Sequence, residues 1–172
     1  MQEFRYETYC GLYCGACDIL MAYQRGLEQQ TPPEWSELGE PLRRHISQAE
    51  IVCHGCKTDT VFAGCAKCPI RKCGRNHPEI ETCLDCKRYP CWRHKFFKIV
   101  IALLNFEKKL PHQKIKPRNL QTIREKGLRA WLEEQQRVWA CPDCQTSFSW
   151  YQRKCKQCGR ELDSIKDYNN LK

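Results

Sequence analysis

The residues best suited to chemistry in this sequence are its 15 cysteines, which stand among 172 residues at short, repeated spacings. Thiolate sulfur is a preferred ligand of zinc and of iron–sulfur clusters, and a CxxC pair can offer two sulfurs to one ion from a single turn. The pattern therefore predicts a protein organised by metal ions. The predicted metal ligands are Cys10, Cys14, Cys17, Cys53, Cys56, Cys65, Cys68, Cys73, Cys83, Cys86, Cys91, Cys141, Cys144, Cys155 and Cys158.

The last four cysteines form the clearest motif. They occur as CPDC and CKQC pairs with ten residues between the pairs, which is the arrangement of a zinc ribbon. Four thiolates in tetrahedral reach close the coordination sphere of the metal and leave no position for a substrate. We therefore expect a structural Zn²⁺ at Cys141, Cys144, Cys155 and Cys158.

The other eleven cysteines do not divide into sets of four, so their pairing stays open. Interleaved sites use the same spacings as local ones. A local assignment gives two complete sites and a third that a histidine, carboxylate, water or substrate must complete. The histidines nearest to cysteines are His54, His77 and His94. The local sites are Cys53/Cys56/Cys65/Cys68, Cys73/Cys83/Cys86/Cys91 and the incomplete Cys10/Cys14/Cys17.

The spacing C-x3-C-x2-C of Cys10, Cys14 and Cys17 has a second interpretation. Three cysteines at this spacing hold an iron–sulfur cluster with one open iron in radical SAM enzymes, but those enzymes need a barrel of strands and helices. This chain has neither the length nor the strand pattern for one. We therefore expect about three to four zinc ions in the protein, with an iron–sulfur cluster at Cys10, Cys14 and Cys17 as the alternative.

Composition agrees with metal binding in a reducing compartment. Apolar residues make up 41% of the chain, but this figure includes the 15 cysteines. The remaining apolar core is therefore lean and needs disulfides or metal ions to stabilise it. An odd number of cysteines excludes complete internal disulfide pairing. The N-terminus does not resemble a signal peptide, and no apolar run approaches the roughly 20 residues of a membrane span. The sequence thus predicts a cytoplasmic protein without membrane attachment, whose cysteines are reduced.

Charge bears on the class of partner. The formal net charge is +9, but it falls to roughly +2 if every cysteine is a thiolate bound to one of four divalent ions. The central cysteines are surrounded by basic and aromatic side chains, a mixture that can bind single-stranded nucleic acid. The simpler interpretation is that the cations offset the negative metal–thiolate centres and that the aromatic residues are core. These residues are Arg71, Lys72, Arg75, Lys87, Arg88, Arg93, Lys95, Tyr89, Trp92, Phe96 and Phe97.

Helices must position most of these groups. Apolar spacing predicts helices that begin at Asp18 as a cap, at Thr31 as a cap (over 31–49), at residue 92 (over 92–110) and at residue 119 (over 119–138). The helix over 92–110 is the most hydrophobic, so we expect it near the middle of the fold. Gly127 lies inside the last helix, where it could mark a close packing contact. Residues 51–91 should be mostly loops and tight turns, and residues 147–151 a short strand.

Four segments together resemble the cysteine-rich domain-of-unknown-function family numbered 3795. They are CGLYCGACDIL, CAKCPIRKC, CLDCKRYPCW and IREKGLRAWLEEQQRVWACPDC, and they cover nearly the whole chain in order. The resemblance implies a prokaryotic, cytoplasmic, zinc-binding protein with no assigned activity. It also implies metal-ligand roles for ten of the first eleven cysteines, all except Cys65, but it provides no catalytic residues.

The sequence therefore predicts a small metal-organised α-rich (α+β) protein, with helices joined by cysteine-rich knuckles and loops. Its parts would be a metal-binding domain over 1–117, a connecting amphipathic helix over 118–138 and a zinc ribbon over 139–172. Closed sites, and the absence of a phosphate loop or HExxH motif, favour a non-enzymatic adaptor for a protein or nucleic-acid partner. The alternatives are an iron–sulfur protein or enzyme and a metal-trafficking protein.

Overall fold

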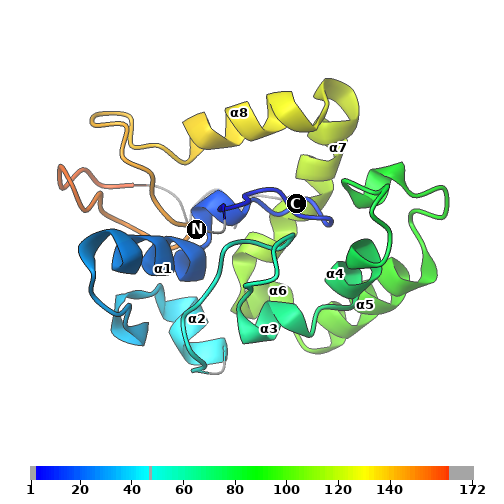
Figure 1. Ribbon diagram of the computed structural model, residues 1–172, viewed down its shortest axis with the longest axis horizontal. Helices are drawn as coiled ribbons and strands as arrows, with labels where there is room; N and C mark the ends of the chain where they lie inside the picture. The colour runs from blue at the N-terminus through cyan, green and yellow to red at the C-terminus, as the bar shows by residue number, and fades with distance from the viewer. Residues whose placement is uncertain (1–2, 47, 163–172) are drawn as a thin grey trace.

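The computed structural model describes residues 3–46 and 48–162. In these residues, helices joined by loops make up the fold, which agrees with the predicted α-rich class (Figure 1). The helices are α1 (Asp18–Gln29), α2 (Glu40–His45), α3 (Ala63–Ala66), α4 (Pro69–Arg75), α5 (Trp92–Leu103), α6 (Phe106–Lys109), α7 (Lys116–Lys126) and α8 (Leu128–Val138). Short 3-10 turns are η1 (Cys14–Ala16), η2 (Trp35–Glu37), η3 (Cys83–Asp85) and η4 (Pro111–Ile115).

Helix α1 begins at Asp18 itself, so its N-cap lies one residue before the predicted cap. Cys17 occupies the N-cap position, and Asp18 is the first helical residue. The carboxylate of Asp18 instead accepts hydrogen bonds from Gly39 N at 3.2 Å and Ser149 Oγ at 2.9 Å. Capping by Asp18 was therefore a wrong prediction, because tertiary donors take its oxygen. Leu20 is fully buried on the inner face of α1.

The single helix predicted over 31–49 is also wrong, because the chain forms η2 and then α2. Glu34, and not Thr31, provides the capping box of η2. The break falls at Gly39, where an added Cβ would lie 2.3 Å from Cβ of Tyr151. Close approach of the C-terminal segment thus requires glycine here, and the ψ of 144° at Gly39 interrupts the helix.

The hydrophobic helix predicted over 92–110 ends at Leu103 and lies at the surface. Ile101 is its one buried residue, whereas the exposed fractions of Trp92 and Phe96 are 68% and 59%. The prediction of a central position, and of a core role for these two aromatic residues, is therefore wrong. Helix α5 lies at the end of the molecule opposite the C-terminal loops (Figure 1).

The helix predicted over 119–138 is divided at Gly127 into α7 and α8. Gly127 has φ 86° and ψ 160°, a backbone conformation that glycine alone adopts readily. Nothing lies within 4 Å of the position that its Cβ would take. The predicted close packing contact is therefore wrong, and the backbone conformation is the reason for glycine. Trp131, on α8, is fully buried.

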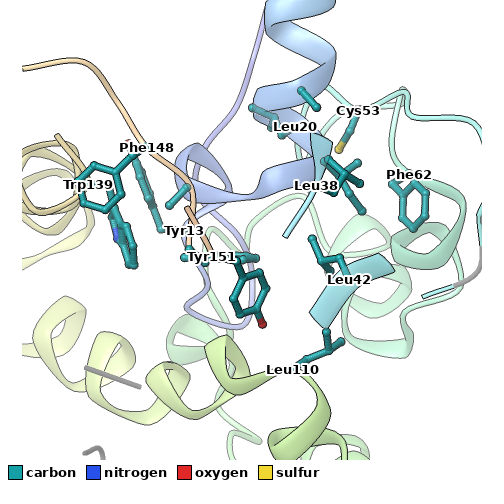
Figure 2. Packing of buried hydrophobic residues seen from close by; sticks show 14 of the residues in the cluster. Tyr13, Leu20, Leu38, Leu42, Cys53, Phe62, Leu110, Trp139, Phe148 and Tyr151 are labelled. Atoms are coloured by element: carbon teal, nitrogen blue, oxygen red, sulfur yellow. The ribbon is translucent and has the colours of Figure 1, made fainter. Parts of the chain in front are cut away.

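One core joins the predicted parts of the chain. Trp150 N donates a hydrogen bond of 2.9 Å to Ala16 O, so the C-terminal segment packs against η1 and α1. The ring of Tyr13 meets the indole of Trp131 edge-on at 6.1 Å. The predicted division into three parts stays a prediction, and residues 163–172 of the last part lie outside the described residues. Figure 2 shows the core residues Tyr13, Leu20, Leu38, Leu42, Cys53, Phe62, Leu110, Trp139, Phe148 and Tyr151.

Extended pairing within residues 3–46 and 48–162 is limited to isolated bridges. Ser147 pairs with Ala140, but the residues after it turn away, so the strand predicted over 147–151 is wrong. The other bridges join Glu7 to Tyr13 and Lys154 to Glu161. Among the described residues, no helix combines the length and the apolar character that crossing a membrane requires.

Candidate metal centres

The four C-terminal cysteines come together as the sequence predicts. All four Sγ atoms lie within 4.8 Å of one another. Cys141 Sγ is 3.6 Å from Cys158 Sγ, and Cys144 Sγ is 3.5 Å from Cys155 Sγ. Four sulfurs around a tetrahedral zinc, with Zn–S bonds of about 2.3 Å, are about 3.8 Å apart. The arrangement is therefore capable of holding a metal ion.

Two equivalent turns present these thiols. Gln145 N donates to Cys141 O at 2.8 Å, and Gly159 N donates to Cys155 O at 3.0 Å. Both donors directly follow the second cysteine of a pair, and both have positive φ, 59° and 75°. The repeated geometry shows that each CxxC pair forms the same knuckle, so the two knuckles offer equivalent pairs of sulfurs.

Local electrostatics prepare one of these thiols for binding. Hydrogen bonds with the hydroxyl and the amide of Thr146 lower the pKa of the Cys144 thiol to about 6. A thiolate is the form that binds a cation. Arg160 and Asp143 form an ion pair of 2.5 Å that links the two knuckles.

Seven of the eleven other cysteines form a second group, which we call the seven-thiol cluster. Burial is the main cause that raises the pKa of Cys14 well above its usual value, and Cys56, Cys17 and Cys53 add electrostatic repulsion. The pKa of the Cys65 thiol is raised in the same way, first by desolvation and then by Cys17 and Cys53 among others, although the residue as a whole is exposed. The members of the cluster are Cys10, Cys14, Cys17, Cys53, Cys56, Cys65 and Cys68.

The Cys10 thiol is an electrostatic neighbour of Cys56, Cys68 and Cys83. Burial and then the neighbouring Cys10 thiol raise the pKa of Cys56 to about 12. Cys10 also acts on Cys68, which caps the N-terminus of α4. Cys56 in turn adds to the raised pKa of Cys14. The thiols of the cluster therefore interact across the boundaries of the local assignment, and the pairing of these cysteines stays a prediction.

The four remaining cysteines line one small cavity of about 30 Å³ beside α4 and α5. Their grouping agrees with the local assignment. Burial raises the pKa of Cys83, and Cys10 and Cys91 add to the effect, so this group borders the seven-thiol cluster. The four are Cys73, Cys83, Cys86 and Cys91.

The sulfur atoms in these two groups are less closely spaced than those of the ribbon. Within the described part of the chain, the C-terminal quartet is the one group of three or more candidate ligands whose ligand atoms all lie within 4.8 Å of one another. Burial is the main cause of the raised pKa values in these groups, and repulsion between neighbouring thiolates adds to it. A divalent cation would reverse that effect, because each thiolate would face positive charge.

The three histidines considered as extra ligands differ in environment. The imidazole of His54 is stacked on Phe4 at 4.6 Å, and exposed His77 pairs with Glu79 at 3.2 Å. His94 Nε2 is buried and has no hydrogen-bond partner. His94 lines, together with Cys10, a cavity of about 390 Å³. Of the three, His94 is therefore the one placed to complete a site.

His112 is an unusual residue that the sequence analysis missed. It is buried, its ring stacks on Trp150 at 4.0 Å, and its Nδ1 lies 2.5 Å from Tyr151 Oη. Burial, together with the charge of Lys116, lowers the pKa of His112 to about 3. No motif surrounds His112, so only its tertiary contacts reveal it.

Two of the central arginines serve the loop that carries Cys56. Arg71 donates to Cys56 O at 2.9 Å and to Thr58 O at 2.7 Å, and Arg75 forms an ion pair with Asp59. These contacts hold the loop against α4. Arg71 and Arg75 are therefore structural and are poor candidates for partner contacts.

Comparison with known proteins gives one match. The model of a family described as "Protein of unknown function (DUF3795)" matches residues 6–96, slightly more than half of the chain. The matched segment contains all cysteines of the seven-thiol cluster and of the cavity quartet. No curated protein and no solved structure matches.

Proposed function

Because the chain belongs to the DUF3795 family of proteins of unknown function, no activity comes with its family, and we propose a function from its thiol sites. The protein is a zinc-organised adaptor: closed thiolate sites fix the fold, and the surface that they support binds a partner. The observation that best supports metal binding is the C-terminal quartet, whose four sulfurs lie within 4.8 Å of one another.

Zinc is the ion that suits this quartet best. Four thiolates in a tetrahedral arrangement are typical of structural zinc. A structural site of this kind contributes on the order of 10 kcal/mol to folding. That is comparable to the whole net stability of a domain, about 5–15 kcal/mol, so the metal would decide whether this lean core folds.

The other eleven cysteines would hold the remaining zinc ions. Within the seven-thiol cluster we assign one site of four ligands and an adjacent site of three, with Cys56 as a neighbour of both. The cavity quartet supplies another site of four. With the ribbon, the chain would bind about three to four Zn²⁺ as structural ions in a reducing, cytoplasmic environment. The proposed sets are Cys14/Cys17/Cys53/Cys65, Cys10/Cys56/Cys68, Cys73/Cys83/Cys86/Cys91 and the ribbon quartet.

A second candidate function rests on the site at Cys10. This cysteine and His94 line the same cavity of about 390 Å³, so a metal held by Cys10, Cys56 and Cys68 would have an accessible fourth position. Such a site favours exchange, as in metal trafficking. The iron–sulfur alternative at Cys10, Cys14 and Cys17 has less support, because the thiols whose pKa values Cys10 raises are Cys56, Cys68 and Cys83.

Metal analysis of protein purified without air tests the proposal. We expect about three to four zinc ions per chain, no visible absorption, and the loss of one zinc in Cys155→Ala. Iron with acid-labile sulfide and a broad visible band would overturn the zinc assignment. Release of zinc to a chelator then separates the two candidate functions, because one fast-exchanging ion would support trafficking and uniformly slow release would support the adaptor.

A further inference from the structure

The outer face of α5 carries a continuous row of large apolar side chains. Trp92, Phe96, Ile99 and Leu103 are 68%, 59%, 57% and 77% exposed. Among the described residues, these four and Leu104 make up most of the exposed large hydrophobic side chains. An unpartnered concentration of this kind on one helix is typical of an interaction surface.

The spacing of the four residues identifies the geometry of the row. Steps of four, three and four residues place them at the a and d positions of a heptad repeat. The opposite face, at the f positions, points inward: Ile101 is buried, and His94 packs edge-on against Tyr89 at 4.8 Å. We call Trp92, Phe96, Ile99 and Leu103 the α5 seam.

The charged residues along the α5 seam are all basic. Arg93 and Lys95 take the e and g positions on either side of Phe96, and Lys98 follows. Arg93 lies over the ring of Trp92 at 5.0 Å. Helix α5 contains no acidic residue, and the next one in the sequence, Glu107, comes after the helix ends. A helix that pairs with the seam would therefore need negative e and g residues.

We propose that the α5 seam docks an amphipathic helix of a partner protein, whose own apolar seam is flanked by acidic side chains. This rests on the proposed adaptor function and specifies its partner. Apolar knobs of the two helices would interdigitate, and carboxylates would face Arg93 and Lys95. Electrostatic complementarity would set the orientation and the specificity of the pair.

Other occupants fit the seam less well. A second copy of α5 would bring the same basic residues to the flanks of the seam, where like charges repel. A membrane-surface helix has a broader apolar face than a row confined to a and d positions. Single-stranded nucleic acid stacks on aromatic rings, but half of the seam is aliphatic.

Designed peptides provide the test. One labelled peptide of about three heptads has Leu at a and d and Glu at e and g, and its control has Lys at e and g. Fluorescence anisotropy measures both against the zinc-loaded full chain. We expect the Glu peptide to bind at least about tenfold more tightly than the Lys peptide, with weaker binding at high salt.

Three variants identify the surface. Phe96→Gln with Leu103→Gln should weaken binding of the Glu peptide at least about tenfold. Val138→Gln is the matched control, because Val138 is a 54% exposed apolar residue on another helix, and it should change nothing. Arg93→Glu with Lys95→Glu should reverse the preference between the two peptides.

Several outcomes would overturn the docking proposal. One is a dissociation constant of the Glu peptide above about 1 mM, and another is equal binding of both peptides. A third is a dimer in sedimentation equilibrium that becomes a monomer in the Gln variant. Binding of phosphatidylserine vesicles or of a single-stranded oligonucleotide through the seam, in place of the peptide, would also overturn it. Zinc content is measured on every sample, so a failure of the metal proposal is seen separately from a failure of docking.

Discussion

Ser149 donates a hydrogen bond of 2.9 Å to the carboxylate of Asp18, which lies 131 residues earlier in the chain. Both side chains are buried, with 7% and 5% of their surfaces exposed. Burial raises the pKa of Asp18 to about 6, against the effect of its hydrogen bonds from Ser149 and Gly39. This polar contact ties the C-terminal segment to the first turn of α1.

Ser149→Ala should therefore destabilise the protein. The substitution removes one of two donors to a buried carboxylate oxygen, a loss of about 1–3 kcal/mol in the free energy of unfolding. Urea denaturation of the zinc-loaded protein measures it. Ser36→Ala is the matched control, because the Ser36 hydroxyl donates to Glu34 at 2.9 Å on the exposed surface. Equal effects of the two substitutions would show that the buried hydrogen bond contributes no more to stability than the exposed one.

His112 should make stability depend on pH. Its pKa is lowered to about 3 in the folded protein, whereas an unfolded histidine has a pKa of about 6.5. Below about pH 6.5 the unfolded state binds a proton that the folded state does not, so stability falls as the pH falls towards 3. The slope contributed by His112 is up to about 1.4 kcal/mol per pH unit.

His112→Phe removes this titration while keeping an aromatic ring against Trp150. We expect the unfolding free energy of the variant to fall less steeply between about pH 6.5 and pH 4. Zinc release also destabilises the protein in acid, but both proteins share the metal sites, so the difference between their slopes isolates His112. Parallel slopes for wild type and His112→Phe would contradict the assignment.

Sequence patterns predicted features that depend on neighbours in the chain. The ribbon knuckles follow from two CxxC pairs, and α1 follows from its apolar spacing. The division at Gly127 and the break at Gly39 were missed because each depends on conformation or on a distant contact, the latter with Tyr151. Helical periodicity does not reveal a single residue with positive φ.

The surface position of α5 could not be predicted for a different reason. Its hydrophobicity indicated burial, but the core is filled by aromatic residues such as Trp131, Trp139 and Phe148. The grouping within the seven-thiol cluster could not be predicted from the sequence either. Cys10 and Cys56 are brought together by the loop that Arg71 holds against α4. Cysteine spacing alone cannot distinguish local from interleaved sites.

Gly127→Ala should destabilise the junction of α7 and α8. The surroundings are open, so the cost comes from the backbone conformation alone, about 1–3 kcal/mol. Thermal or urea unfolding measures it, and zinc content should not change. Gln136→Ala, an exposed substitution on α8, should stay within about 0.5 kcal/mol of wild type. A Gly127→Ala protein as stable as wild type would show that the junction relaxes without cost.

The pairing of the N-terminal cysteines can be tested by counting ions in double variants. If Cys14 and Cys53 share a site, then Cys14→Ala and Cys53→Ala each lose one zinc, and the double variant also loses only one. The local assignment puts these residues in different sites and requires the loss of two. Cys14→Ala with Cys73→Ala is the control that should lose two under either assignment.

Zinc per chain, measured by mass spectrometry after dialysis against a weak chelator, gives the answer directly. Far-UV circular dichroism of each variant must first show that the helices persist, because an unfolded chain would lose every ion and report no pairing. Cys155→Ala provides an internal standard, since the ribbon quartet is separate from the seven-thiol cluster. Loss of two zinc ions from the double variant at Cys14 and Cys53 would reject the interleaved assignment, because adjacent but independent sites lose their ions additively.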